Sequence, residues 1–167
     1  VGAMQLGIMY LFSFRAYVYL SVSEFLLFTV LTPLYITLIY DLLSKRRLRW
    51  GYLLSAALAV IGAAIIRYDK VSDHFWTGLM FVQLANLSFA IGMVGYKRLM
   101  ETRPMPQHNA FAWFYMGAVI VAVAAWFMLG NPQKLPTTSL QWGVLVWLGV
   151  VASGLGYFMW NYGATQV

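Results

Sequence analysis

Apolar stretches of membrane-spanning length fill most of this sequence, and they restrict the folds open to the chain. Six such stretches can be counted, over residues 1–20, 25–43, 50–66, 75–99, 110–129 and 141–167. A helix that crosses a bilayer needs about 20 mainly apolar residues. Only 10% of the residues are charged, whereas soluble domains carry about 25%. The sequence therefore predicts an all-α membrane protein with six transmembrane helices.

Two local signals predict how the second stretch begins and bends. Ser21 or Ser23 is a suitable N-cap, because a serine hydroxyl can accept a bond from the first free backbone N–H groups. Pro33 lies at the middle of the stretch and removes one helical hydrogen bond, so we expect a kink there. Thr29 or Thr32 could satisfy the backbone group that the proline releases.

The basic residues predict the orientation in the membrane. The loops after the second and fourth stretches hold seven Lys and Arg residues, and the other loops hold three. Loops rich in Lys and Arg face the cytoplasm, so we expect the loops around Arg46 and Arg103 to be cytoplasmic. The same loops explain the net charge of +6 without a nucleic-acid partner. The absence of cysteine excludes thiolate metal sites and fits a bacterial inner membrane.

A possible internal repeat relates the two ends of the chain. At an offset of 147 residues, Gly2 aligns with Gly149, Gly7 with Gly154 and Tyr10 with Tyr157. The predicted topology makes these two stretches cross the membrane in opposite directions. Inverted repeats of this kind are common in secondary transporters.

The period of the repeat predicts how much of each copy is present. One period holds five spans, so two inverted copies would make a ten-helix (5+5) carrier. We expect residues 1–74 to be the last three helices of the first copy. Residues 75–167 would then be the first three helices of the second copy, so the chain would be an internal fragment of the carrier.

Several runs resemble the EamA-type carriers of the drug/metabolite transporter superfamily. The first repeat of that family is similar to Phe14–Ser21, Leu31–Leu34 and Leu53–Gly62, and the start of its second repeat resembles Tyr157–Ala164. The resemblance implies an inverted-repeat inner-membrane transporter of a small solute. Two positions depart from the pattern, because Arg46 stands where the family commonly has Glu and Ser55 where it commonly has Gly.

Three further runs resemble the biotin-transporting members of that family. They are Ser44–Gly51, Gly95–Ala110 and Val151–Gly154. This resemblance implies biotin uptake, with no cofactor and with membrane lipid as the surroundings. An exporter of amino acids, amines or other metabolites of the same family is the alternative. The sequence leaves the oligomeric state open.

Biotin presents a carboxylate, a ureido group and an apolar bicycle, so its site would need a cation, polar partners and aromatic walls. Arg15 is the only Lys or Arg that lies within an apolar stretch and away from the loops, and an intramembrane charge usually faces a cavity or a partner. It could hold the carboxylate, or it could reach the outer surface or pair with Glu24. Gln83 and Asn86 could bind the ureido group, or they could join helices.

Aromatic and amide groups at both ends of the chain complete the predicted site. Tyr10 and Phe14 share a face of the first stretch, and Tyr157, Trp160 and Asn161 lie in its counterpart. Two such faces that cross in opposite directions would line a central cavity, although aromatic stripes can also face lipid or pack between helices. The predicted substrate-binding residues are Tyr10, Phe14, Arg15, Gln83, Asn86, Tyr157, Trp160 and Asn161.

An intramembrane protease is a remote alternative. Ser153 lies in a run close to the Gly-x-Ser-Gly pattern of rhomboid proteases, but Val151 stands where glycine is needed. A serine nucleophile also needs a neighbouring base. His74 and His108 both fall in predicted loops. We therefore expect no enzymatic activity.

Overall fold

The computed structural model describes residues 1–43, 50–66 and 74–166, and every regular element within them is a helix. The helices, with π- and 3₁₀-helical segments marked η, are η1 (Ala3–Ile8), α1 (Met9–Ala16), α2 (Val22–Thr29), α3 (Thr32–Leu43), α4 (Trp50–Ile66), α5 (Phe75–Thr102), α6 (Gln107–Leu129), η2 (Pro132–Lys134), α7 (Ser139–Trp147), η3 (Leu148–Leu155) and α8 (Gly156–Ala164).

Four helical segments of the described residues are long and apolar enough to cross a membrane. They are Val22–Leu43, Phe75–Thr102, Gln107–Leu129 and Ser139–Ala164. The other two predicted spans are helical but shorter, since α1 ends at Ala16 and α4 has 17 residues. The chain is thus an all-helical membrane protein, and its division into six spans stays a prediction.

The connection predicted between the fourth and fifth spans is shorter than expected. α5 continues to Thr102, whose hydroxyl donates to the Arg98 carbonyl (2.9 Å), and α6 already begins at Gln107. His108 therefore lies in the first turn of a helix, and its placement in a loop was wrong. Hydropathy cannot locate such helix ends, because polar residues are common in the first and last turns of membrane helices.

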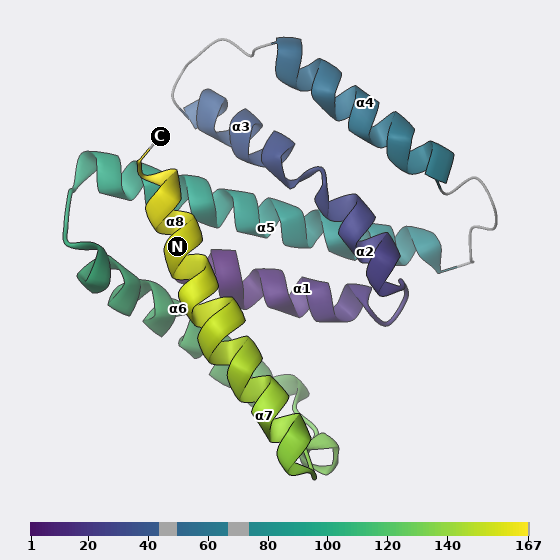
Figure 1. Ribbon diagram of the computed structural model, residues 1–167, viewed down its shortest axis with the longest axis vertical. Helices are drawn as coiled ribbons and strands as arrows, with labels where there is room; N and C mark the ends of the chain where they lie inside the picture. The colour runs from purple at the N-terminus through teal and green to yellow at the C-terminus, as the bar shows by residue number, and fades with distance from the viewer. Residues whose placement is uncertain (44–49, 67–73, 167) are drawn as a thin grey trace.

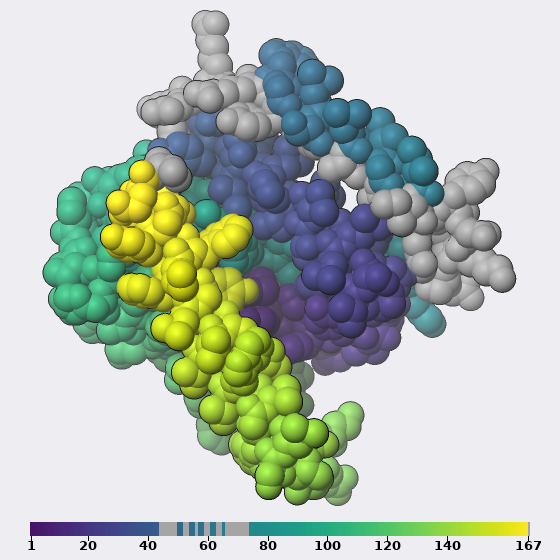
Figure 2. Space-filling view, in the orientation of Figure 1, coloured from purple at the N-terminus to yellow at the C-terminus, as the bar shows by residue number. Residues whose placement is uncertain are grey.

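The long helix α5 lies at the centre of the arrangement (Figure 1). α1 and η1 pack along it, as do α2 and α3, and α8 crosses it near its C-terminal half. α6 packs against η1, while α4 contacts α3 at the edge of the molecule. Figure 2 shows α7 as an arm that projects from this body. The helices at the two ends of the chain, η1 and α1 at one end and α8 at the other, therefore all pack against α5.

The start of α2 follows the predicted capping pattern. Ser21 is the N-cap residue, and its hydroxyl accepts a bond from the Glu24 backbone N–H at 3.4 Å. The Glu24 carboxylate accepts in return from the Ser21 backbone N–H at 2.6 Å. This reciprocal pair satisfies two backbone donors at the helix start, so the prediction of Ser21 as a cap is confirmed.

The predicted kink in the second span is a full break between α2 and α3, at Val30 and Leu31. Among the described contacts, neither threonine hydroxyl donates to the Thr29 carbonyl that Pro33 releases. The Thr29 hydroxyl donates to the Leu26 carbonyl at 2.7 Å, whereas the Asn86 side-chain amide donates to the Phe28 carbonyl at 2.9 Å. A side chain of α5 therefore bonds to the last turn of α2, next to the break.

Two π-helical segments occur at the offset found in the sequence. η1 covers Ala3–Ile8, and adding 147 to these numbers gives residues 150–155, which lie inside η3. π-helical turns are rare and are frequent at functional sites. Their matched positions support the proposed repeat by an observation independent of residue identity.

Candidate substrate-binding site

The deepest polar contact joins the two ends of the chain. Gln5 and Asn161 are both fully buried. The Gln5 Nε2 atom donates to Asn161 Oδ1 at 2.9 Å, and Asn161 Nδ2 donates to Gln5 Oε1 at 3.3 Å. Gly92 of α5 permits this approach, since a Cβ atom there would lie 2.4 Å from the Gln5 Cβ. The side-chain amide of Asn161 is therefore already hydrogen-bonded to Gln5 of η1.

Tyrosine hydroxyls bind the η3 segment from two sides. The Tyr10 hydroxyl lies 2.7 Å from the Ser153 hydroxyl. The Tyr115 hydroxyl of α6 donates to the Gly154 carbonyl and also approaches the Ser153 carbonyl at 3.2 Å. Tyr10 further makes an edge contact with Tyr157, with 6.3 Å between the ring centroids. Tyr115 thus supplies a hydrogen-bond partner to carbonyl groups of the π-helical segment, and Tyr10 to the hydroxyl of Ser153.

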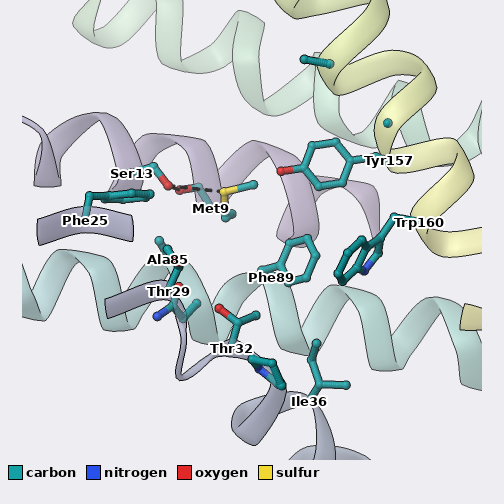
Figure 3. A pocket seen from close by; sticks show the side chains of 14 residues that line it. Met9, Ser13, Phe25, Thr29, Thr32, Ile36, Ala85, Phe89, Tyr157 and Trp160 are labelled. Carbon is teal, nitrogen blue, oxygen red and sulfur yellow. Dashed lines mark hydrogen bonds between the residues drawn. The ribbon is translucent and has the colours of Figure 1, made fainter. Parts of the chain in front are cut away.

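A cavity of about 540 Å³ lies between α1, the α2–α3 break, α5 and the η3–α8 segment; we call it the central cavity (Figure 3). Its aromatic walls are Phe25, Phe89, Tyr157 and Trp160. Its polar lining residues are Ser13, Thr29, Thr32 and Asn86. None of the described residues that line it carries a charge. The central cavity is therefore suited to a solute with an apolar body and neutral polar groups.

Asn86 supplies a polar group at a defined position in the central cavity. Its amide nitrogen is engaged by the Phe28 carbonyl. Its Oδ1 atom accepts no hydrogen bond from the described residues, so it remains an acceptor for a ligand N–H group. On α8, the Trp160 indole nitrogen lies 3.2 Å from the Met93 sulfur, and the Trp160 ring packs beside Phe89.

A second cavity of about 740 Å³ lies on the other side of α1, between α1, α6 and η3. Tyr10, Phe14, Tyr115 and Ser153 are among the residues that line it. The ring of Phe14 stacks on that of Tyr10, with centroids 5.7 Å apart. α1 thus separates two hollows that the sequence analysis treated as one.

The structure divides the predicted site residues among three places. The central cavity receives Asn86, Tyr157 and Trp160. The second cavity receives Tyr10 and Phe14. Neither cavity is lined by Arg15, Gln83 or Asn161.

The two remaining polar candidates lie in different surroundings. Arg15 is exposed in the last turn of α1. Gln83 faces α3, where its Oε1 atom accepts a bond from the Tyr35 hydroxyl at 3.0 Å. Its buried Nε2 atom has no hydrogen-bond partner in the part of the chain that the structure describes. Direct contact of either residue with a substrate stays a prediction.

Several lining residues were missed by the sequence analysis. Thr29 and Thr32 flank the helix break, and a break in an apolar helix is a signal for backbone and hydroxyl groups that face a cavity. Phe89 follows Asn86 by three residues, so the two share a face of α5. Gln5 lines neither cavity and is visible in the sequence as an isolated amide in an apolar stretch, but nothing in the sequence identifies Asn161 as its partner.

Comparison with known proteins relates the whole chain to membrane carriers. It is 81% identical over all 167 residues to a protein named "Biotin transporter" in Escherichia coli K12, of which it covers 56%. It is 80% identical over the same length to the "Biotin transporter" of Salmonella typhimurium, again covering 56% of that protein. A "Probable biotin transporter" of Pseudomonas aeruginosa is 50% identical over 169 aligned residues, with 59% of that protein covered.

The EamA-like transporter family matches residues 76–167, which is more than half of the chain. The chain spans little more than half the length of the curated relatives that it matches. No solved structure shows a significant match.

Proposed function

This chain belongs to the EamA-like transporter family, and on that premise we propose that it is part of a carrier that takes up biotin across a bacterial inner membrane. The observation that carries the proposal is its 81% identity, over every residue, to a protein named as a biotin transporter. The relatives that it matches are carriers, so the chain is not an enzyme.

The central cavity has properties that suit biotin. Sites for small ligands usually enclose about 300–1,000 Å³ and combine apolar walls with a few polar groups, and this cavity encloses about 540 Å³. The Oδ1 atom of Asn86 would accept a hydrogen bond from a ureido N–H. The rings of Phe89, Tyr157 and Trp160 would cover the bicycle. The neutral lining also explains why the carboxylate would need a cation elsewhere.

The other predicted residues have proposed roles away from the ureido group. Arg15 is exposed, so it would attract the biotin carboxylate at the mouth of the carrier. Tyr10 and Phe14 would meet substrate from the second cavity. Gln83 and Asn161 would hold helices in place, because their side chains already bond to Tyr35 and Gln5.

The proposed architecture is a ten-helix inverted repeat, with residues 1–74 from the first copy and 75–167 from the second. The family match begins at residue 76, next to this boundary, which supports the division. Cytoplasmic loops around Arg46 and Arg103 remain part of the proposal, and Arg46 lies outside the described residues.

Uptake by the full-length protein tests the function. Cells that lack biotin synthesis and other biotin carriers should accumulate labelled biotin when they produce the protein. An excess of unlabelled biotin should compete, whereas amino acids and amines should not. Failure of the wild-type protein to accumulate biotin, with normal amounts in the membrane, would overturn the proposal.

A pair of tryptophan variants tests the position of the site. Trp160→Ala should weaken biotin uptake, because it removes a wall of the central cavity. Trp147→Ala is the matched control, since Trp147 is equally exposed (58% against 56%) in the same continuous helical segment but lines neither cavity. Equal effects of the two substitutions would contradict the placement of the site.

A further inference from the structure

The helices α1 and η3 form a wall between the central cavity and the second cavity. On α1, Met9 lines the central cavity and the next residue, Tyr10, lines the second. Two adjacent residues of η3 divide in the same way, because Ala152 lines the central cavity and Ser153 lines the second. Each of the two helical segments therefore presents one side to each cavity.

Two contacts join the segments of this wall. The Tyr10 hydroxyl on α1 lies 2.7 Å from the Ser153 hydroxyl on η3. The ring of Tyr10 also meets the ring of Tyr157 edge-on, with 6.3 Å between their centroids, although Tyr157 lines the central cavity. In this structure the two cavities are therefore separate, and the Tyr10–Ser153 contact lies on the boundary between them.

The two cavities differ in charge. The described residues that line the central cavity are all uncharged. Lys134, at the end of η2, lines the second cavity together with Asn131. No Asp or Glu is among the described residues that line the second cavity, so no carboxylate opposes Lys134 there. An exposed cation at the mouth of a cavity attracts anions. The second cavity therefore offers a carboxylate the cation that the central cavity lacks.

One face of α6 leads from the mouth of the second cavity to the wall. Its lining residues recur every three or four positions and so share a face: Tyr115, Ala118, Val119, Ala122, Ala125, Trp126 and Leu129. From Tyr115 to Leu129 this face rises about 21 Å along the helix axis. The small alanine side chains leave room for a solute, and the inner end carries the Tyr115 hydroxyl that bonds to η3.

We propose that the second cavity is an outer binding site for biotin, in which Lys134 meets the carboxylate before the solute reaches the central cavity; this inference rests on the proposed function. The predicted topology places the loop that holds Lys134 outside the cell. The bicycle would lie against Trp126 and the alanines of α6. Movement into the central cavity would then require the Tyr10–Ser153 contact to open. A lipid acyl chain is the competing occupant.

Uptake by the full-length protein tests the role of Lys134. Lys134→Gln should raise the biotin concentration needed for half-maximal uptake about two- to fivefold, the range expected for an exposed ion pair, and leave the maximal rate unchanged. Lys134→Arg should behave like wild type. Arg103→Gln is the matched control, since Arg103 is an exposed cation that lines neither cavity, and it removes the same charge without an effect.

An uncharged analogue separates a contact with the carboxylate from a general effect. Biotinamide keeps the bicycle and the chain but has no negative charge, so its competition with labelled biotin should be weaker in wild type. Lys134→Gln should lose this preference for biotin over biotinamide. An unchanged preference in Lys134→Gln would overturn the proposal and leave the proposed function standing. If wild type takes up no biotin, the proposed function itself fails.

Cysteine labelling locates the solute, in a full-length protein without other cysteines. A membrane-impermeant methanethiosulfonate added outside should modify Ser153→Cys, and biotin should slow this reaction. Ala152→Cys should react more slowly, because Ala152 lies on the other side of the wall. Gln133→Cys is the control: Gln133 is exposed and outside both linings, so it should react equally with and without biotin.

A variant on α6 repeats the labelling without a change at the Tyr10–Ser153 contact. Ala122→Cys lines the second cavity and should likewise be protected by biotin. If Ser153→Cys and Ala122→Cys react from outside without protection by biotin, or do not react because a lipid chain or another helix covers them, the second cavity is not an outer biotin site. Equal reaction rates for Ala152→Cys and Ser153→Cys would contradict the wall.

Discussion

Gln5 and Asn161 are 156 residues apart in the sequence and exchange two hydrogen bonds between fully buried amides. The predicted repeat would not duplicate the pair, because the offset of 147 places Ala152 opposite Gln5 and Phe14 opposite Asn161. These two bonds therefore join η1, at the start of the chain, to the last part of α8, where Gly92 of α5 allows the close approach.

The first prediction concerns this amide pair. Either single change, Gln5→Leu or Asn161→Leu, should lower the free energy of unfolding in detergent by about 1–3 kcal/mol, because the remaining amide is left buried without a partner. The double variant should lose less than the sum of the two, since no unpaired amide remains. Thermal unfolding of the purified full-length protein measures the cycle.

An additive double variant would contradict this account. A contact of Asn161 with substrate would instead show as weaker biotin binding in Asn161→Leu at unchanged stability. The cycle therefore separates the predicted substrate contact from a bond between helices.

The second prediction concerns the tyrosine that supports η3. Tyr115→Phe removes the hydroxyl that donates to the Gly154 carbonyl, so it should reduce stability by about 1 kcal/mol and slow biotin uptake. Tyr162→Phe is the control, since Tyr162 is 46% exposed and stacks on Phe158 through its ring alone among the described contacts. Biotin uptake by the two variants is compared at equal amounts of protein in the membrane. Equal uptake by Tyr115→Phe and Tyr162→Phe would contradict the role of η3.

The third prediction compares two glycines, Gly156 of α8 and Gly143 of α7. Gly156 lines the central cavity, and a Cβ atom there meets nothing closer than the Val151 carbonyl oxygen at 3.7 Å. Gly156→Leu should therefore fold normally, narrow the cavity and raise the biotin concentration needed for half-maximal uptake at least about tenfold, equivalent to 1.4 kcal/mol.

Gly143→Leu provides the comparison. Its Cβ atom would meet nothing within 4 Å, and Gly143 lines neither cavity. Both leucines favour helix over glycine to a similar degree. Biotin uptake that is unchanged in Gly156→Leu would place the substrate outside the central cavity.

The fourth prediction concerns Arg15. Because Arg15 is exposed and lines neither cavity, it should act on the biotin carboxylate through its long-range field. Arg15→Ala should weaken uptake at low ionic strength and approach wild type at high salt, and Arg15→Lys should retain activity. A loss in Arg15→Ala that is independent of salt would indicate direct contact with the carboxylate.

Periodicity and composition were sufficient to predict the class of fold. Long apolar runs must form helices in lipid, because no water is present to satisfy exposed backbone groups. The cap at Ser21 and the break near Pro33 are equally local, since each depends on a few adjacent residues. The resemblance to EamA-type carriers followed from contiguous runs, and the comparisons confirm it.

Tertiary structure alone decided which polar groups are free to bind a solute. Asn161, Gln83 and Asn86 look alike in the sequence, as isolated amides in apolar helices. Packing pairs Asn161 with Gln5, turns Gln83 toward Tyr35 and places Asn86 in the lining of the central cavity, with its nitrogen bonded to the Phe28 carbonyl. Helical spacing fixes the face on which a side chain lies, but the partner opposite that face comes from a distant segment, so only the packed helices determine whether a polar atom is satisfied or open.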